Sequence, residues 1–530
     1  MTNRKIYTLI TFSILLFSLV SFASQQRSNQ PDHITLTWSE SPATTQTITW
    51  RTDSTITDGV VQYSLFADAN HLGESKYSHI LQSKSEVLIT EKKQKMYIHS
   101  VVIEGLTPDT KYSYRVGTAN NFSTIHTFST EPSTSKPFSF LLFGDSQSGD
   151  TIPNYVPWHN TITNAYSNNK DAKFVINMGD MVEYGQVYNH WNNWFDAAKG
   201  VIENIPEMPI EGNHETYTSK KNNFEKPESF ISQFKLPQNG PEALKNQVYS
   251  YDYSNVHFVV IDSQFDEEKS VANFIDIQKE WIEKDLASTQ KEWKIVLFHK
   301  SIYYNSTNRA NELLKNAFTP LFDKYHVDLV FNAHDHSFSR TFPIKNDKYV
   351  SKPSEGTVYY ITGRSGNKSY PQFTPKVWDA FFYNPKDQPC FELVTVNNTT
   401  LNIKAFNIDN TLIDSYTIDK GNNIDIPQTI IPSRYDSTKL VIYGQLVNSL
   451  SAVEQQNGKW YIPLNTFITN LGGTFTSNDK VISIVLNGKT YSLSKNLLKN
   501  GKSIVADDIK SIFAYSFKYD ESMNVLYFTK

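Results

Sequence analysis

Between residues 138 and 336, apolar runs of strand length repeatedly end in short clusters of Asp, Asn and His. The runs 138–143, 174–178, 257–261, 294–298 and 327–331 have the composition of buried strands, and helical patterns at 276–286 and 310–325 lie among such runs. Strands that alternate with helices predict a layered α/β domain. Because loops leaving the carboxyl ends of strands gather at one edge of such a sheet, distant clusters are expected to converge. The five clusters are Gly144-Asp145-Ser146-Gln147, Gly179-Asp180-Met181-Val182-Glu183-Tyr184, Gly212-Asn213-His214-Glu215, Val296-Leu297-Phe298-His299 and Ala333-His334-Asp335-His336.

The residue types in these clusters suit a metal centre. Carboxylate, amide and phenol oxygens and imidazole nitrogens bind hard or borderline cations. Two ions about 3.5–4 Å apart, bridged by a carboxylate, can clamp the attacking and leaving oxygens of a phosphoryl transfer. Taken singly, each residue has an ordinary explanation: Asp145 could occupy a turn, Asn213 could cap a helix, His299 could be a core histidine and Tyr184 could pack. The ordered set favours one metal site over five independent turns.

The clusters stand in the order found in metallophosphoesterases, and Tyr184, four residues after Asp180, resembles the purple acid phosphatases. The resemblance covers residues 31–418 and implies two metal ions: Fe(III) at the tyrosine site and Fe, Zn or Mn at the other. It also implies that His214 faces the phosphate as an acid or hydrogen-bond donor. The implied ligands are Asp145, Asp180, Tyr184 and His336 for one metal, and Asp180, Asn213, His299 and His334 for the other, with Asp180 bridging.

Three features depart from the family pattern. The first cluster reads Gly-Asp-Ser-Gln where Gly-Asp-x-Gly is usual, and the fifth begins with Ala333 where Gly is usual; neither change touches an implied ligand. After Tyr-Asn-Ser, plant-type relatives carry a His pair that lines the substrate cleft, but this chain has Thr307-Asn308-Arg309. A guanidinium can hold phosphate oxygens in bidentate fashion. Arg309, with Asn308, is therefore a candidate substrate residue that would favour diphosphates; the alternative is a solvated charge at a helix start.

The flanking segments predict further domains, so the expected fold class is multidomain. Short alternating strands such as 34–38 and 111–117 predict an N-terminal β-sandwich, and residues 106–112 resemble a fibronectin type III turn. Residues 460–489 resemble the stalk-like N-terminal domain of copper amine oxidases, which implies a small α+β C-terminal domain. That domain would bind a cell-wall or protein partner; an inert spacer is the alternative. The predicted divisions are a signal peptide at 1–24, the sandwich at 31–131, a four-layer α/β metallophosphoesterase sandwich at 137–418, a linker at 419–434 and the stalk-like domain at 435–530.

The first residues predict export. Arg4 and Lys5 precede an apolar run at 9–20, and a small-residue pattern at 21–23 resembles a cleavage site. An uncleaved anchor is the alternative, although the run is shorter than the roughly 20 residues of a membrane span. We expect a secreted or cell-surface protein of a bacterium. The single cysteine, Cys390, excludes a disulfide within the chain and is expected to be a buried small hydrophobe.

These observations lead to a functional hypothesis. A formal net charge of −4 argues against a nucleic-acid partner, so small phosphorylated molecules are the expected substrates. The prediction is an acid phosphatase-like, metal-dependent phosphoric ester hydrolase that cleaves phosphomonoesters by attack of metal-bound hydroxide. The alternatives are a phosphodiesterase or nucleotidase, and a catalytically weak surface-binding protein. The complete implied ligand set speaks against the last.

Overall fold

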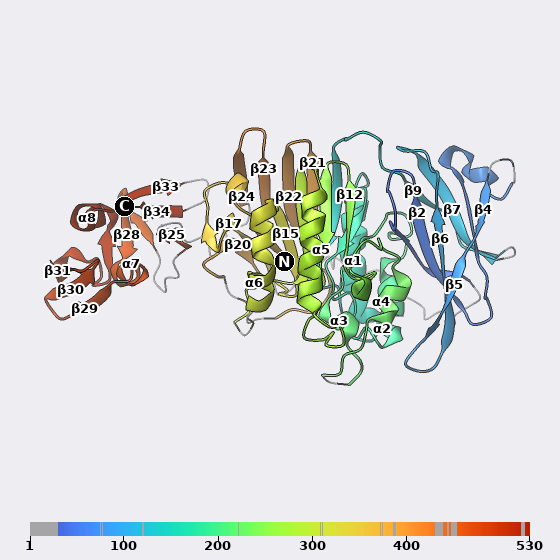
Figure 1. Cartoon of the computed structure of the whole chain (residues 1–530), viewed down its shortest axis with the longest axis horizontal. Coiled ribbons are helices and arrows are strands. Elements are labelled where there is room, and N and C mark those ends of the chain that lie inside the picture. Colours follow the sequence, from blue (N-terminus) through green and yellow to red (C-terminus); the bar gives the residue numbers. More distant parts are fainter. Residues whose placement is uncertain are drawn as a thin grey trace, which may run out of the picture.

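The computed structural model has three bodies along one long axis (Figure 1). It describes residues 30–530 except 75, 77, 119, 120, 221, 308, 310, 371, 372, 374, 385–387, 430–437, 443, 444, 447–452, 521–524 and 530. The predicted signal peptide at 1–24 lies outside the described residues. Among the helices that the structure describes, none is long and apolar enough to cross a membrane.

The N-terminal body is the predicted antiparallel sandwich. Its two sheets enclose one core that includes Leu36 and Trp50 from the first sheet and Tyr114 and Val116 from the second. The hydroxyl of Tyr112 accepts a hydrogen bond from the backbone nitrogen of Thr107 at 2.9 Å. This contact holds the corner that precedes the strand Lys111–Thr118. The first sheet has the order β1 (Asp32–Thr37), β2 (Gln46–Asp53), β6 (Lys95–Ile103), β5 (Lys84–Ile89), and the second β4 (His79–Gln82), β3 (Val60–Leu65), β7 (Lys111–Thr118), β8 (Asn121–Phe122), with β9 (His126–Ser129) also paired to β7.

The central body contains two large sheets that pack face to face. Phe140 of one sheet meets Phe258 of the other edge to face, with ring centroids 5.4 Å apart. The first sheet has the order β11 (Val175–Asn177), β10 (Phe138–Phe143), β21 (Cys390–Asn397), β22 (Thr400–Asn407), β23 (Leu412–Asp419), β24 (Ile424–Thr429). The second has the order β12 (Tyr249–Tyr253), β13 (Val256–Val260), β14 (Trp293–Lys300), β15 (Leu329–Ala333), β19 (Val358–Thr362), β16 (Phe338–Thr341), β20 (Asp379–Tyr383).

Helices cover the outer faces of both sheets, which gives the four layers expected from the sequence. Helix α1 (Val156–Asn168) lies on β10 and β21 and packs against α2 (Tyr188–Ala198). On the other side, α5 (Phe274–Ser288) and α6 (Glu312–Tyr325) share a core with β13, β14 and β15. Strands β10, β11, β13, β14 and β15 correspond to the predicted apolar runs. Their parallel pairing, β10 with β11, β13 with β14 and β14 with β15, places their carboxyl ends at common edges.

The predicted linker at 419–434 was wrong for its central part. Residues Ile424–Thr429 form β24, which pairs with β23 in antiparallel register and closes the six-stranded sheet. Glycine, asparagine and proline near this segment suggested a connection without structure. Pro427 is compatible with β24 because an edge strand can lack one hydrogen-bond donor. Residues 430–434 lie outside the described residues.

The C-terminal body mixes short sheets with two helices and has a core of its own. That core contains Ile462, Phe467, Ile484 and Leu526. The hydroxyls of Tyr349 and Tyr527 are hydrogen-bonded, which joins this body to the central one. Its elements are β25 (Lys439–Ile442), β26 (Gln445–Leu446), β27 (Glu454–Gln456), β28 (Lys459–Pro463), α7 (Leu464–Asn470), β29 (Thr474–Ser477), β30 (Val481–Leu486), β31 (Lys489–Ser494), β32 (Ser503–Val505), α8 (Ala506–Phe513), β33 (Ser516–Asp520) and β34 (Val525–Thr529). The resemblance to a stalk-like domain stays a prediction.

Candidate metal centre

The five clusters supply side chains to one buried site at the carboxyl ends of the central strands. Asp145 follows β10, Asp180 follows β11, and His299 lies within β14. Asn213 opens the short helix α3 (Asn213–Thr216), and His334 follows β15. Asp145, Asp180 and His334 have φ of 45°, 51° and 69°, in the left-handed region that is uncommon for residues other than glycine. Strained backbone of this kind gathers at functional sites, where the surrounding structure holds it in place.

Two overlapping groups of predicted ligands are close enough to hold one cation each. In the first, ligand atoms of Asp145, Asp180 and His336 all lie within 4.8 Å of one another. In the second, the same holds for Asp180, His299 and His334. Nε2 of His336 is 3.2 Å from Oδ1 of Asp145, and Nε2 of His299 is 3.1 Å from Oδ2 of Asp180. Asp180 is the member common to both groups, as a bridging ligand must be.

The orientation of two imidazoles fits metal binding. Nδ1 of His299 donates to the carbonyl of Met178 at 2.8 Å, and Nδ1 of His336 donates to the carbonyl of Lys368 at 2.6 Å. Each hydrogen bond orients the ring and leaves Nε2 facing the carboxylates, the position from which it could bind a metal. A backbone carbonyl behind a ligating histidine is the usual arrangement at metal sites.

Asn213 provides a separate test of whether the residues fit a metal. Its side chain is 3% exposed, and its Nδ2 donates to the hydroxyl of Tyr217 at 2.8 Å. That contact directs the amide oxygen away from Tyr217. Among the described residues, none donates a hydrogen bond to Oδ1. A buried amide oxygen without a partner is costly, and a cation would satisfy it. The donor set of this site therefore fits hard or borderline metal ions.

The charges at the site are strongly coupled. Burial would raise the pKa of Asp180, but the imidazoles of His299 and His214 hold it well below its usual range. Burial opposes the charged form of His299, yet Asp180 raises the pKa of His299 to about 9. Burial and the guanidinium of Arg309 hold the pKa of His334 well below its usual range. The neutral form of His334, which is the ligating form, is therefore favoured.

Two residues that the sequence analysis left without a role organise this site. Gln147, at the position that departs from the family pattern, places Nε2 3.1 Å from Oδ2 of Asp180 and 3.4 Å from Nε2 of His336. Gln147 thus contacts both ligand groups. The sequence had marked it only as a departure from the family pattern. Glu215 is fully buried and accepts hydrogen bonds from the backbone nitrogens of Asp180, Met181, Val182 and Gly212. The only signal for it was its place in the cluster with His214.

The loops held by Glu215 approach one another too closely for a side chain at Gly212. A Cβ there would overlap the backbone nitrogen and Oδ1 of Asp180. Gly179, with φ of 88°, lies against Gly212 from the other loop. The glycines of the second and third clusters are therefore required by this contact, and the contact in turn sets the position of Asp180.

His214 and Lys368 lie beside the metal ligands. Nδ1 of His214 donates to the carbonyl of Glu183 at 2.7 Å, and its Nε2 is 3.8 Å from Oδ2 of Asp180. Nζ of Lys368 is 3.0 Å from both carboxylate oxygens of Glu183 and 3.4 Å from Nε2 of His214. Sequence reasoning missed Lys368, which lies beyond all five clusters on the loop after β19. No local pattern indicated that this loop returns to the site.

The remaining predicted residues are placed less directly. The ring of Tyr184 lies edge-on to His190, with centroids 5.5 Å apart, and its contact with a metal stays a prediction. Asn308 lies outside the described residues. Arg309 forms an ion pair with Asp335 and donates to the carbonyl of His334 at 2.8 Å. Its guanidinium therefore orders the backbone between two ligands, and a direct role toward substrate stays a prediction.

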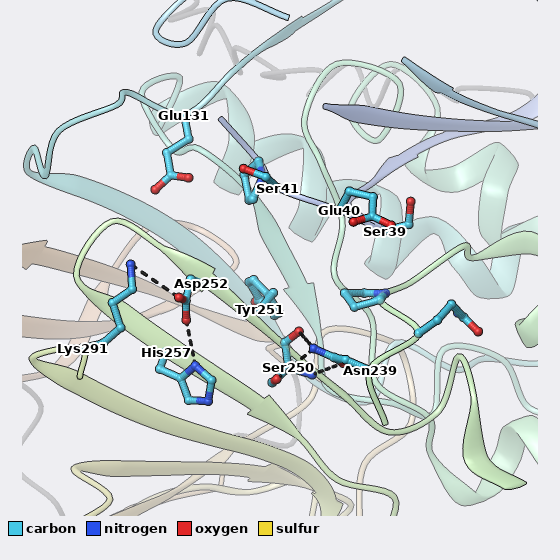
Figure 2. Close-up of a pocket in the computed structure, with 13 residues that line it drawn as sticks. Ser39, Glu40, Ser41, Glu131, Asn239, Ser250, Tyr251, Asp252, His257 and Lys291 are labelled. Atoms are coloured by element: carbon cyan, nitrogen blue, oxygen red, sulfur yellow. Dashed lines mark hydrogen bonds and ion pairs between the residues drawn. The ribbon is translucent and has the colours of Figure 1, made fainter. Parts of the chain in front are cut away.

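A separate cavity of about 700 Å³ lies between the sandwich and the central body (Figure 2), and its lining includes none of the predicted metal ligands. Residues from both bodies line it, among them Glu131 and Asp252. Burial opposes the charged form of His257 in its wall. Hydrogen bonds of 2.7 Å to Asp252 and 2.8 Å to Asp285 nevertheless raise the pKa of His257 to about 9. His257, Asp252 and Asp285 are therefore paired with one another, and the cavity is a charged contact region between the two bodies.

Family models match the two parts of the chain that this geometry singles out. The calcineurin-like phosphoesterase model matches residues 138–338, the region that carries all seven predicted ligands. Fold and site therefore define a metallophosphoesterase. The purple acid phosphatase N-terminal domain model matches residues 31–130, directly before it. The chain belongs to the purple acid phosphatase-like metallophosphoesterases.

Several curated plant proteins are similar to this chain. Purple acid phosphatase 15 of Arabidopsis thaliana is 28% identical over 298 residues, 51% of this chain and 54% of that protein. Purple acid phosphatase 23 of Arabidopsis thaliana is 27% identical over 330 residues, 54% of this chain and 68% of that protein. Another Arabidopsis thaliana relative, named probable inactive purple acid phosphatase 27, is 25% identical over 325 residues, 54% of this chain and 52% of that protein. The chain spans about half the length of two of these three relatives.

Two solved structures share the fold. A purple acid phosphatase from yellow lupin (Lupinus luteus) seeds aligns with a TM-score of 0.60 at 20% identity, covering 74% of each chain. PhoD aligns with a TM-score of 0.55 at 12% identity, covering 76% of this chain and 94% of its own. At these identities the likeness concerns the arrangement of the sandwich and central sheets alone.

Proposed function

We propose that this protein is an extracytoplasmic dinuclear-metal phosphatase that hydrolyses phosphomonoesters. The observation that carries the proposal is the pair of ligand groups that share Asp180, together with the unpaired amide oxygen of Asn213. Two bound cations would neutralise phosphate charge and activate a water molecule for in-line attack. Family membership supports the reaction class, and the apolar run at 9–20 supports the location.

The residues around the ligands can act on the substrate. His214 is held through Nδ1 by the carbonyl of Glu183, so Nε2 is the ring atom that can exchange a hydrogen bond or proton with a phosphate ester. Lys368 lies beside that nitrogen and would attract a phosphate oxygen, while Glu183 fixes the position of its ammonium group. Arg309 acts through Asp335 on the backbone that carries His334. These positions support a role for His214 and Lys368 toward a phosphomonoester, and a preference for diphosphates through Arg309 stays a prediction.

Replacing His214 with Ala is expected to reduce kcat by about 10²–10⁴-fold while two metals stay bound, because general acid or base assistance typically contributes that much. Turnover of an aryl phosphate and metal content on the same preparation test this. His71→Ala is the matched control, since His71 is exposed on the sandwich and should leave both readings unchanged. Loss of a metal together with turnover would make His214 a ligand. A wild-type protein that binds two metals without hydrolysing the ester would point to a catalytically weak binding protein.

The proposed metals are Fe(III) at the Tyr184 site and Fe, Zn or Mn at the other. A phenolate bound to ferric iron absorbs visible light by charge transfer, as the resemblance implies for this family. Tyr184→Phe is expected to abolish that band and to leave the thermal unfolding midpoint within about 2 °C, since loss of one hydroxyl in a domain of this size is a small change. Absorption spectra and iron analysis on both proteins test this. Iron-loaded wild type without a visible band would contradict the tyrosinate assignment.

A further inference from the structure

A second cluster of acids lies beside the proposed metal centre and contains no histidine. Oxygens of Glu211, Asp262 and Glu268 all lie within 4.8 Å of one another. The three residues are 1%, 0% and 5% exposed. Glu211 directly precedes Gly212, and Asp262 follows β13 at the same sheet edge where β14 carries His299. Three segments of the catalytic domain therefore meet at this cluster.

Oxygen atoms at the cluster lack the hydrogen bonds that buried polar groups normally have. Within the described part of the chain, no donor meets either carboxylate oxygen of Glu211 at hydrogen-bonding geometry. Gln264 donates through its backbone nitrogen to Oδ1 of Asp262 at 2.8 Å and through Nε2 to the carbonyl of Glu211 at 3.1 Å. Its own amide oxygen, fully buried, also has no partner among the described residues. The amide oxygen of Gln264, a residue hydrogen-bonded to both Asp262 and Glu211, and the carboxylate of Glu211 are thus both unsatisfied.

Hydrogen bonds from neutral donors offset only part of the negative charge that the three acids would carry when ionised. Nε2 of Gln247 donates to Oδ2 of Asp262 at 3.2 Å and to Oε1 of Glu268 at 2.7 Å. Lys300 and Lys226 are nearby cations, but their ammonium groups form ion pairs with Glu267 at 2.7 Å and with Glu228 at 3.5 Å. Among the described residues, no Lys, Arg or His forms an ion pair with any of the three acids. Burying carboxylates without a compensating charge is expensive, so the cluster must bind either protons or a cation.

We propose that Glu211, Asp262 and Glu268 bind one divalent cation of the hard class, Mg²⁺ or Ca²⁺, with Gln264 as a neutral oxygen ligand. Such cations take oxygen ligands from carboxylates and amides. The absence of imidazole from this described group distinguishes it from the Asp/His groups that hold the paired metals, where borderline ions bind. The cation fixes Glu211, and through it the segment that leads to Gly212 and Asn213. It is therefore a structural ion that positions a catalytic loop.

The alternative is a neutral cluster in which the acids carry protons, because burial and the neighbouring acids raise the pKa of Asp262 well above its usual range. The two states respond oppositely to one substitution. Asp262→Asn removes a ligand and should abolish cation binding. In a protonated cluster the same change replaces one neutral group by another of equal shape, so stability should stay or rise.

The experiment uses the full chain with its paired metals in place. Wild type is dialysed against a metal-free buffer, then titrated calorimetrically with CaCl₂ and MgCl₂, and its thermal unfolding midpoint is followed. We expect one additional binding site per chain and a midpoint that rises by several degrees on saturation. In Asp262→Asn and Glu268→Gln the additional site and the shift should disappear, while transition-metal content stays at two per chain.

Asp266→Asn is the matched control, because Asp266 is an exposed acid on the same loop. It should bind the additional cation as wild type does. Wild type that shows neither binding heat nor a midpoint shift with either salt would overturn the proposal, even if the variants failed to fold. Equal shifts in wild type and Asp262→Asn would assign the stabilisation to other surface acids and would also overturn it.

Discussion

Asp180→Ala is expected to lose both metal ions and to lower turnover to the level of the uncatalysed reaction. Asp180 is 1% exposed and is the one residue shared by the two ligand groups. Its Oδ2 lies 3.1 Å from Nε2 of His299, and its Oδ1 accepts a hydrogen bond from the backbone nitrogen of His214 at 2.9 Å. No neighbouring side chain can replace a carboxylate that two cations share.

The effect should be separable from unfolding. Asp150→Ala is the control, since Asp150 is an exposed acid shortly after the cluster that contains Asp145. Its side chain is outside both ligand groups. Metal content by mass spectrometry, turnover of an aryl phosphate and circular dichroism on both variants measure the three quantities. An Asp180→Ala protein that keeps two metals per chain and normal turnover would show that the metal centre lies elsewhere.

The convergence of the candidate ligands was predictable because neighbouring parallel strands end at the same edge of a sheet. An apolar run followed by Asp145 or Asp180 predicts both the strand and the edge at which the carboxylate lies. The structure brings Asp145, Asp180, His299, His334 and His336 together as that rule requires. Each strand, and the polar residue that follows it, can be recognised from local sequence alone. A single sequence was therefore enough to predict this convergence.

The residues that the sequence analysis missed depend on long-range contacts. Lys368 lies 154 positions after His214, and only the folded loop after β19 brings its ammonium group to 3.4 Å from that imidazole. Arg309 was proposed to hold phosphate oxygens, and that role stays a prediction. Its ion pair with Asp335 is a long-range contact that local sequence does not encode. Likewise, β24 becomes a strand only because β23 offers it an open edge.

Glu215 stood in one of the five clusters, but the sequence did not indicate its role. Its replacement should reduce metal binding more than any other predicted change except Asp180→Ala. Oε2 of Glu215 accepts from the backbone nitrogens of Gly212 at 2.7 Å and Asp180 at 2.9 Å. Oε1 accepts from the nitrogen of Met181 at 2.9 Å. Glu215→Ala would leave these buried donors unpaired, at about 1–3 kcal/mol each. The two loops that carry Asp180 and Asn213 should then separate.

The expected result for Glu215→Ala is a large loss of affinity for both metals together with a fall of several degrees in the unfolding midpoint. Glu215→Gln should also lose affinity, since one oxygen would become an NH₂ group facing backbone donors. Metal titration of each purified variant, with thermal unfolding on the same samples, separates the two effects. Glu225→Gln, at an exposed acid ten residues away, is the control and should behave as wild type. If Glu215→Gln bound metals as tightly as wild type, carboxylate acceptance would not be what holds the loops. The geometry of the metal centre would then depend on the close contact of Gly179 with Gly212 alone.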